Sequence, residues 1–413
     1  MSQLTLAADV RSYFTSSGLV DDALGHGGTA FLPFGDPAMS FHQVNESFER
    51  WLADRCMAVG CEVVTADLKR KHERMKKDAF VFLRATFFRW AGTIERLCPD
   101  LADTPRALSV GDAHIENFGT WRDDEGRLVW GANDFDEASV ISYPFDLVRL
   151  AASARLAPKI FMDGPETCAA LLKGYQEGLG NPRPTVLDEC HAWLRKLVVC
   201  PDDKRDKFWK EVDALESVKP PRFVRDALIG ALPKDADVVR FATRTAGGGG
   251  LGRPRYVAIA EWRGGRVVRE AKALVPSAWD WAHRSPNPAP RFAELAAVST
   301  RAPDPYMTVT DGFVVRRLAA DSRKAELIVH PDAELPDKVL EELDENDIHL
   351  QHKLLHAMGR EIGTLHAATA DVRAIEMDLN GRDRDWLHTA SKNAAKAVKE
   401  DFKTWKAPVP PPV

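Results

Sequence analysis

The chain has 413 residues, 45% hydrophobic and 28% charged, with a formal net charge of −5 at pH 7. This length allows two or three lobes with a large core, and the composition is that of a folded, water-soluble protein. The acidic balance argues against a nucleic-acid partner, which calls for clustered Lys and Arg. No window approaches the roughly 18 uninterrupted apolar residues of a membrane helix, and no signal-peptide pattern opens the chain. We therefore expect a cytoplasmic protein without a membrane partner.

The cysteines also favour a cytoplasmic location. All six lie in the first half of the chain, and none forms a Cys-x-x-Cys pair. This usage is typical of reduced, mostly buried thiols in a reducing compartment.

The first half of the chain predicts helices around two strands. Residues 67–97 carry apolar side chains at helical spacing and favour a helix or a helix pair. Residues 106–112 and 127–135 are strand-like runs, and residues 144–157 form a helix entered through its proline. Helices are expected to dominate residues 165–232.

The character of the sequence changes after residue 236. A glycine-rich loop leads into two alternating runs joined at Gly264 and Gly265, which predicts a β-hairpin. Residues 312–318 favour a further strand, residues 336–405 return to helix, and the end is proline-rich. We divide the chain into a helical and loop-bearing region (1–235), a β-rich region (236–330), C-terminal helices (331–405) and a tail (406–413).

The segment "SVGDAHIENFGTWRDDEGRLVWGANDFDEAS" gathers oxygen ligands around one short hairpin. Asp112, His114 and Asn117 share a loop, and Asp134 and Asp136 follow the next strand. In kinase chemistry an Asp accepts the proton of the attacking hydroxyl, while an Asn and a later Asp hold magnesium against the nucleotide phosphates. Hard oxygen ligands of this kind suit Mg²⁺. A calcium-like or merely capped turn cluster is the alternative, since turns also favour Asp and Asn.

The motifs resemble those of the protein-kinase-like superfamily. "GDAHIEN" is similar to its catalytic loop, and the histidine matches the aminoglycoside and choline phosphotransferase branch. "NDFDEA" resembles the magnesium motif of that branch, which implies a metal role for Asp134. Asp146 in "PFDLVRLA" matches the aspartate that braces the catalytic loop there. The wider chain, over roughly residues 65 to 370, resembles the bacterial domain of unknown function 2252.

The run "AGGGGLG" places Gly247, Gly249 and Gly252 in G-x-G-x-x-G spacing before a strand rather than a helix. This context is that of the kinase glycine loop, whose backbone covers the nucleotide phosphates. In ordinary kinases this loop precedes the catalytic loop, whereas here it follows it. We take circular permutation as the working hypothesis; a flexible linker between lobes is the alternative.

The alternation of side chains along the hairpin strands predicts which basic residue would pair with the phosphates. With a two-residue turn at Gly264 and Gly265, the residue two after the last loop glycine shares a face with Arg269, and Lys272 points away. Arg269 is therefore favoured over Lys272. The helix glutamate that pairs with such a cation is not identified, and Glu294 is a guess.

Other charged residues have weaker claims. Arg84 and Arg316 are candidates for contact with phosphate or substrate, although a partly buried arginine more often pairs with a structural carboxylate. The residues His349, His352 and His356 could share one helix face and bind a transition metal, but surface or packing roles are favoured.

We expect an α+β protein with a two-lobed, permuted kinase-like fold that transfers the γ-phosphoryl group of ATP with Mg²⁺ to an unknown, metabolite-like hydroxyl. Asp112 would act as base beside His114, with Asn117, Asp134 and Asp136 at the metal. The alternatives are a nucleotide-binding regulator, a nucleotidyltransferase on the same fold and, last, a two-metal phosphoesterase.

Overall fold

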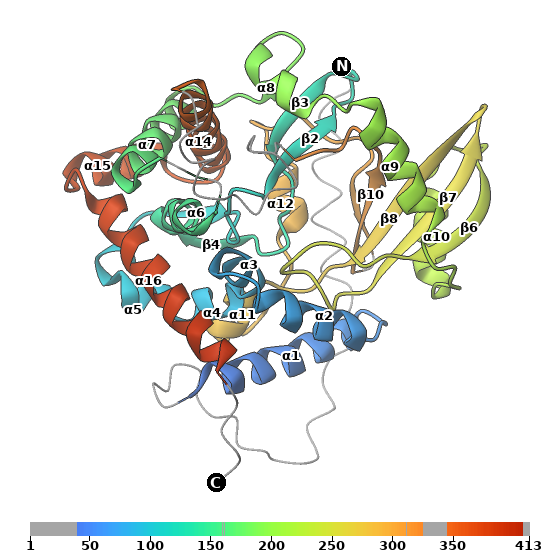
Figure 1. Cartoon of the computed structure of the whole chain (residues 1–413), viewed down its shortest axis with the longest axis horizontal. Helices are drawn as coiled ribbons and strands as arrows, with labels where there is room; N and C mark the ends of the chain where they lie inside the picture. Colours follow the sequence, from blue (N-terminus) through green and yellow to red (C-terminus); the bar gives the residue numbers. More distant parts are fainter. Residues whose placement is uncertain (1–38, 159, 161, 311, 325–344, 408–413) are drawn as a thin grey trace, which may run out of the picture. The chain divides into compact units, whose positions relative to one another are not determined.

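The computed structural model describes residues 39–158, 160, 162–310, 312–324 and 345–407, and all of them belong to one compact unit, Pro37–Val413. The unit is a mixed α+β structure with three antiparallel sheets (Figure 1). Within these residues no helix has the length and apolar character needed to cross a membrane. The predicted boundary at residues 330/331 and most of the proline-rich tail lie outside the described residues.

The segment predicted as a helix or helix pair is broken into several short helices. After α1 (Phe41–Ala58), the chain forms α2 (Thr65–Met75), α3 (Ala79–Ala85), α4 (Phe87–Ala91), α5 (Ile94–Leu97) and the 3₁₀ turn η1 (Pro99–Leu101). Aromatic side chains hold these pieces together; Phe48 of α1 stacks on Phe88 of α4 with ring centroids 4.6 Å apart.

Two small sheets present the acidic segment. Strand β1 (Arg106–Ser109) pairs with β4 (Ser139–Ser142), and β2 (Phe118–Arg122) pairs with β3 (Leu128–Ala132), which also takes the short β5 (Thr185–Val186). The turn between β2 and β3 is closed by Asp123, whose carboxylate accepts the N–H groups of Glu125 and Arg127. The strands at both predicted runs are thus present, and β2 was not predicted.

Helix α6 (Pro144–Leu156) begins at its predicted proline and lies buried behind the acidic segment. The predicted helical region that follows contains α7 (Gly164–Gly180), α8 (Ala192–Val198), α9 (Asp202–Asp213) and α10 (Arg222–Gly230). The C-terminal helices are α14 (Glu345–Ala367), α15 (Val372–Gly381) and α16 (Trp386–Lys406). Residues 336–344, also predicted to be helical, are not among the described residues.

Helices α7 and α14 run side by side in unusually close contact (Figure 1). A Cβ atom at Gly174 would lie 1.9 Å from the carbonyl oxygen of His356, and one at Gly178 would lie 2.1 Å from that of Arg360. Gly359 and Gly363 of α14 have equally little space against α7. Four glycines in two i, i+4 pairs therefore allow the two helix backbones to touch.

The largest sheet has five strands in the order β6-β7-β8-β10-β9. Its strands are β6 (Asp237–Thr243), β7 (Arg255–Trp262), β8 (Gly265–Ala273), β9 (Thr308–Thr310) and β10 (Phe313–Leu318), and the short helices α11 (Ala278–Ala282) and α12 (Phe292–Ala296) connect β8 to β9. One sheet face packs its small apolar residues on α10, and the other face meets α9 at one end.

The β7–β8 hairpin turns one residue earlier than predicted. Trp262 pairs with Gly265, so Arg263 and Gly264 form the turn, and both have positive φ. Two successive positive φ values are what a type I′ hairpin turn requires, and the adjacent Gly265 starts β8 instead.

Candidate active site

One pocket of about 300 Å³ is lined by most of the residues singled out by the sequence, but Arg269, Lys272, Gly252 and Asp146 are not among its lining residues. Its walls come from the loop after β1, the end of β3, the glycine loop and strand β10. The lining side chains include the predicted Arg84, Asp112, His114, Asn117, Asp134, Asp136 and Arg316. The acidic side chains lie on the loop-bearing elements, whereas several arginines come from the five-stranded sheet.

The loop after β1 is fixed from below by Asp146 of α6. Its carboxylate oxygens accept the N–H groups of Val110 at 2.8 Å and Gly111 at 2.9 Å. Gly111 has φ +77°, and a Cβ there would lie 2.2 Å from the carbonyl oxygen of Glu137. Both the backbone conformation and the space therefore require glycine immediately before Asp112.

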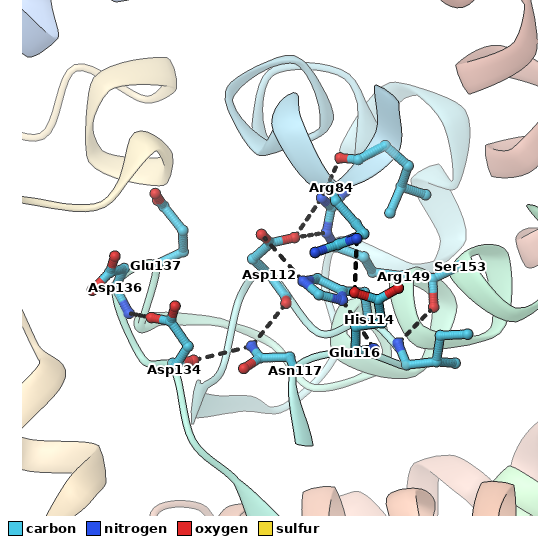
Figure 2. A network of polar contacts seen from close by, with 12 residues as sticks. Arg84, Asp112, His114, Glu116, Asn117, Asp134, Asp136, Glu137, Arg149 and Ser153 are labelled. Atoms are coloured by element: carbon cyan, nitrogen blue, oxygen red, sulfur yellow. Dashed lines mark hydrogen bonds and ion pairs between the residues drawn. The ribbon is translucent and has the colours of Figure 1, made fainter. Parts of the chain in front are cut away.

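Asp112 is held by a buried arginine that the sequence did not single out (Figure 2). The Nε and NH2 groups of Arg149, on α6, donate to Oδ1 of Asp112 at 2.7 and 2.5 Å. Burial raises the pKa of the Asp112 carboxyl, and the adjacent guanidinium of Arg149 opposes this change. The ion pair occupies Oδ1, so Oδ2 is the oxygen available to a ligand.

His114 is a neutral neighbour of this carboxylate. Its Nδ1 accepts the N–H of Glu116 at 3.2 Å, which leaves the proton on Nε2, 3.9 Å from Oδ2 of Asp112. Burial, together with the positive charges of Arg84 and other neighbours, holds the pKa of His114 well below its usual value. A neutral imidazole can donate a hydrogen bond here without adding charge.

Asn117 and Asp134 supply oxygen atoms on the other side of Asp112 (Figure 2). The side-chain NH₂ group of Asn117 donates to the carbonyl oxygens of Asp112 and Asp134, which fixes the amide. Its Oδ1 is buried and has no hydrogen-bond partner. An orphaned amide oxygen beside a carboxylate is a donor set that fits Mg²⁺, because this ion takes one or two carboxylates and other hard oxygens.

The described residues contain no group of three His, Cys, Asp or Glu side chains able to hold a metal ion. A metal in this pocket would therefore depend on the amide of Asn117 together with Asp134. Burial opposes ionisation of Asp134, but Lys272 and two arginines hold its pKa far below the usual value. Its carboxylate is thus charged and, with 44% of the side chain exposed, open to the pocket.

Lys272 of β8 reaches this acidic group from the sheet. Its Nζ lies 2.6 Å from Oδ1 of Asp136 and 3.3 Å from Oδ1 of Asp134. Arg253 also pairs with Asp136, at 3.0 Å, and with Glu137, at 2.8 Å. Asp136, predicted as a metal ligand, is thus already paired with two cations, and Asp134 is the more accessible carboxylate.

Strand alternation predicted that Arg269, and not Lys272, lies on the face of the hairpin that forms the pocket. This prediction is wrong. Arg269 pairs with Ala258 across the hairpin, on the face covered by α10, and its Nε donates to the carbonyl of Ala231. The assumption at fault was that the residue two after the last loop glycine faces the nucleotide. In the structure the residue three after it, Arg255, pairs with Lys272 and faces the pocket.

The glycine loop connects β6 to β7 and closes over Asp112. A Cβ at Gly249 would lie 3.6 Å from Oδ2 of Asp112 and 2.6 Å from the carbonyl oxygen of Arg84. Gly247 and Gly252 have positive φ, and a Cβ at Gly252 would meet Leu68 at 2.5 Å. Glycine is therefore required at the spaced positions by backbone conformation or by space.

Helix α2 anchors both ends of this loop. Val64 donates its N–H to the carbonyl of Gly252, and Arg74 donates to that of Gly247. Thr245 donates its hydroxyl to the carboxylate of Asp67 at 2.8 Å. The loop is thus tied to the helical part of the chain, which argues against a free linker.

The remaining predicted residues divide between the pocket and the surface. Arg84 lines the pocket and pairs with Glu116 at 2.8 Å, and Arg316 pairs with Glu270 at 2.9 Å. Glu294 pairs with Arg291 on α12 and does not line the pocket. Of the three histidines of α14, His356 contacts Glu177 at 3.2 Å, which suits the favoured packing role.

Comparison with known sequence families gives a match over part of the chain. The sequence family described as "Uncharacterized protein conserved in bacteria (DUF2252)" matches residues 64–178, which is part of the span expected from the sequence. The matched segment runs from α2 to α7 and includes Asp112, Asn117, Asp134 and Arg149, whereas the glycine loop lies outside it. No curated protein and no solved structure was found to be similar to the chain.

Proposed function

We propose that this protein is a Mg²⁺-dependent phosphotransferase that moves the γ-phosphoryl group of ATP to a hydroxyl of a small acceptor. One observation carries the proposal: Lys272, on the third strand of the sheet whose first two strands the glycine loop joins, lies with its Nζ 3.3 Å from Oδ1 of Asp134. Protein kinases place a glycine loop over the phosphates and a lysine on the third strand, near the metal-binding aspartate. The proposal is supported by the contacts of this pocket, where the glycine loop lies against Asp112 and both Lys272 and Asn117 contact Asp134.

Each residue has a role in this proposal. Asn117 Oδ1 and Asp134 would hold Mg²⁺, which neutralises charge on the phosphates during transfer. Lys272, kept in place by Asp136, would pair with the phosphates, and the glycine loop would cover them with backbone N–H groups. Oδ2 of Asp112 would accept the proton of the attacking hydroxyl, while Arg149 orients the carboxylate.

The proposal includes a permuted kinase-like order of elements. In a permuted fold the new ends of the unit lie close together, because they arise where a connecting loop has been cut. The first and last helices of the described unit meet this condition: the Phe41 ring of α1 and the Trp405 ring of α16 have centroids 5.6 Å apart. The cytoplasmic location expected from the sequence is kept as part of the proposal.

The alternatives can be ranked by the same contacts. An arginine in place of the phosphate-pairing lysine would favour a nucleotide-binding regulator, and the position of Lys272 beside Asp134 argues against that alternative. A phosphoesterase with two metals needs more ligands than Asp134 and Asn117, and in the described residues no histidine-rich cluster adds to them. Nucleotidyl transfer uses the same parts and is distinguished by its products.

The test is slow turnover of ATP with Mg²⁺, with products separated by chromatography. We expect the wild type to form ADP, and Asp112→Asn and Asp134→Asn to reduce this by at least about a hundredfold, as general-base and metal roles require. Asp124→Asn, which changes an exposed turn residue, is the matched control. AMP and pyrophosphate would redirect the proposal to nucleotidyl transfer, and equal rates in all variants would refute it.

A further inference from the structure

A buried carboxylate in the sheet gathers three arginines that the proposed reaction does not use. Glu270 of β8 is completely buried. Its oxygens contact Arg244 at 2.6 Å, Arg316 at 2.9 Å and Arg255 at 3.1 Å. Arg244 follows β6, Arg255 opens β7 and Arg316 lies on β10, so four strands contribute to one cluster.

The strand register explains why these side chains converge. Arg316 is the direct partner of Glu270 across β8 and β10, so both side chains stand on the same face of the sheet. Arg255 pairs with Lys272, two residues along β8 from Glu270, so it stands on the same face of the sheet. This is the face that forms the pocket wall, and all three arginines line the pocket.

The cluster carries more positive charge than its partner can balance. Three guanidinium groups surround one carboxylate. Asp134 also acts electrostatically on Arg255 and Arg316, but within the described residues no ion pair joins any of the three arginines to a second carboxylate. Although burial opposes ionisation, the three arginines hold the pKa of Glu270 well below its usual value. A purely structural role for one buried carboxylate needs fewer cations, since desolvating each charge is costly.

The positive cluster lies next to the glycine loop. NH2 of Arg255 lies 3.3 Å from where a Cβ of Gly250 would be and 3.4 Å from that of Gly247. A guanidinium beside a glycine-rich loop suits phosphate oxygens, because the planar guanidinium binds two oxygens at once and the backbone of such a loop can offer further N–H donors.

We infer that Arg244, Arg255 and Arg316, assembled on Glu270, form a phosphate-binding subsite that holds phosphoryl groups without a metal ion. The inference rests on the proposed function in one respect, the use of ATP as a probe, and it adds a binding site for phosphate to that function. Its ligand is either the polyphosphate chain of the nucleotide or a phosphate group on the acceptor, and the chemistry of recognition is the same for both.

The test is calorimetric titration of the metal-free protein, in the presence of EDTA, with inorganic tripolyphosphate. We expect the wild type to bind, and Arg244→Gln and Arg316→Gln to bind at least about tenfold more weakly, as loss of a charge-assisted hydrogen bond implies. Arg266→Gln is the matched control, since it removes one positive charge from β8 outside the pocket. Asp134→Asn should retain binding, because no metal is involved.

Arg244 is the safer variant, because 32% of its side chain is exposed and its loss should not unfold the protein. A melting curve for each variant confirms folding. No tripolyphosphate binding by the wild type, unchanged affinity in folded Arg244→Gln, or an equal loss in Arg266→Gln would each overturn the inference.

A competition experiment separates the two sources of phosphate. If saturating ATP abolishes tripolyphosphate binding, the subsite holds the nucleotide; if inorganic phosphate still binds to the ATP-loaded protein in an Arg316-dependent way, it holds the acceptor. Failure of the proposed function looks different: cluster-dependent binding without ATP turnover preserves the subsite. If the cluster variants turn over ATP and bind ATP and tripolyphosphate as tightly as the wild type does, the proposed function stands and the subsite is refuted.

Discussion

At the scale of single residues, the pair of Asp112 and Arg149 dominates the pocket. Arg149 is 1% exposed and lies over the rings of Phe87 and Trp90, so its charge depends on the carboxylate for compensation. The pair therefore links packing of α6 to the orientation of Asp112. This double role makes the two contributions separable only by a double-mutant comparison.

We predict that Arg149→Met destabilises the protein by about 3–5 kcal/mol, because the Asp112 carboxylate would be left buried without its cation. In an Asp112→Asn background the same change should cost at least about 1 kcal/mol less. Urea unfolding of the four proteins of the cycle measures both values. Equal costs in the two backgrounds would show that the pair is not coupled.

A second prediction concerns the pH dependence of stability through His114. Burial first, and the charge of Arg84 next, keep this imidazole neutral in the folded state, whereas the unfolded chain binds a proton below its ordinary pKa of about 6.5. The unfolded state thus binds more protons at low pH, and stability falls as the pH drops below 6.5. At pH 5 the loss is up to about 2 kcal/mol.

The variant His114→Asn should remove this loss, since the amide oxygen can still accept the N–H of Glu116. Urea unfolding at pH 5 and 7.5 gives the comparison, with His349→Asn, at an exposed position, as the control. A wild-type loss that persists in His114→Asn would contradict the prediction.

At the scale of elements, the sequence predicted what depends on local pattern. The proline-initiated helix α6 and strand β10 follow from periodicity and punctuation, which are local properties. The direction of Arg269 and Lys272 does not, because it depends on how many loop residues separate the last glycine from the first ladder pair of β7. One residue more or less moves every side chain to the other face.

Contacts between distant segments were equally inaccessible. Arg149 carries no signal that distinguishes it from any helical arginine, and its partner is 37 residues away. The three arginines around Glu270 come from β7, β10 and the end of β6, and the order of these strands in the sheet is a property of the tertiary fold. The aspartate and asparagine motifs could be predicted from their spacing in the sequence. The cations that complete the pocket could not, because the strand order of the sheet brings them together.

The contact of α7 with α14 gives a prediction at this scale. Gly178→Ala places a methyl group 2.1 Å from the carbonyl oxygen of Arg360, so the helices must separate. We expect a loss of about 1–3 kcal/mol or more, as for other overpacked interiors. Gly180→Ala on the same helix, where nothing lies within 4 Å, should be neutral. Chemical unfolding of both variants decides the matter, and similar stabilities would count against backbone contact.

At the scale of the whole molecule, segments from both ends of the described chain build the support for the pocket. Helix α16 packs on α6, α3 and α1, and Asp401 accepts two hydrogen bonds from Arg89 of α4. Asp146, which fixes the loop before Asp112, also contacts His366 of α14 at 3.4 Å. The pocket therefore depends on helices more than 200 residues apart, so its geometry reports on the folding of the entire unit.

The cysteines offer a readout of that folding. Five of the six are buried and only Cys190 is exposed. Burial raises the pKa of Cys56 and Cys98 to about 11, so these thiols lack both access and thiolate character at pH 8. We predict that an aromatic disulfide reagent titrates one fast thiol per folded chain and six in denaturant. Cys190→Ser should abolish the fast reaction without changing the slow one. Because the slow thiols react only when the unit opens, their rate should match global unfolding, and a second fast thiol in the native protein would show that part of the core opens independently.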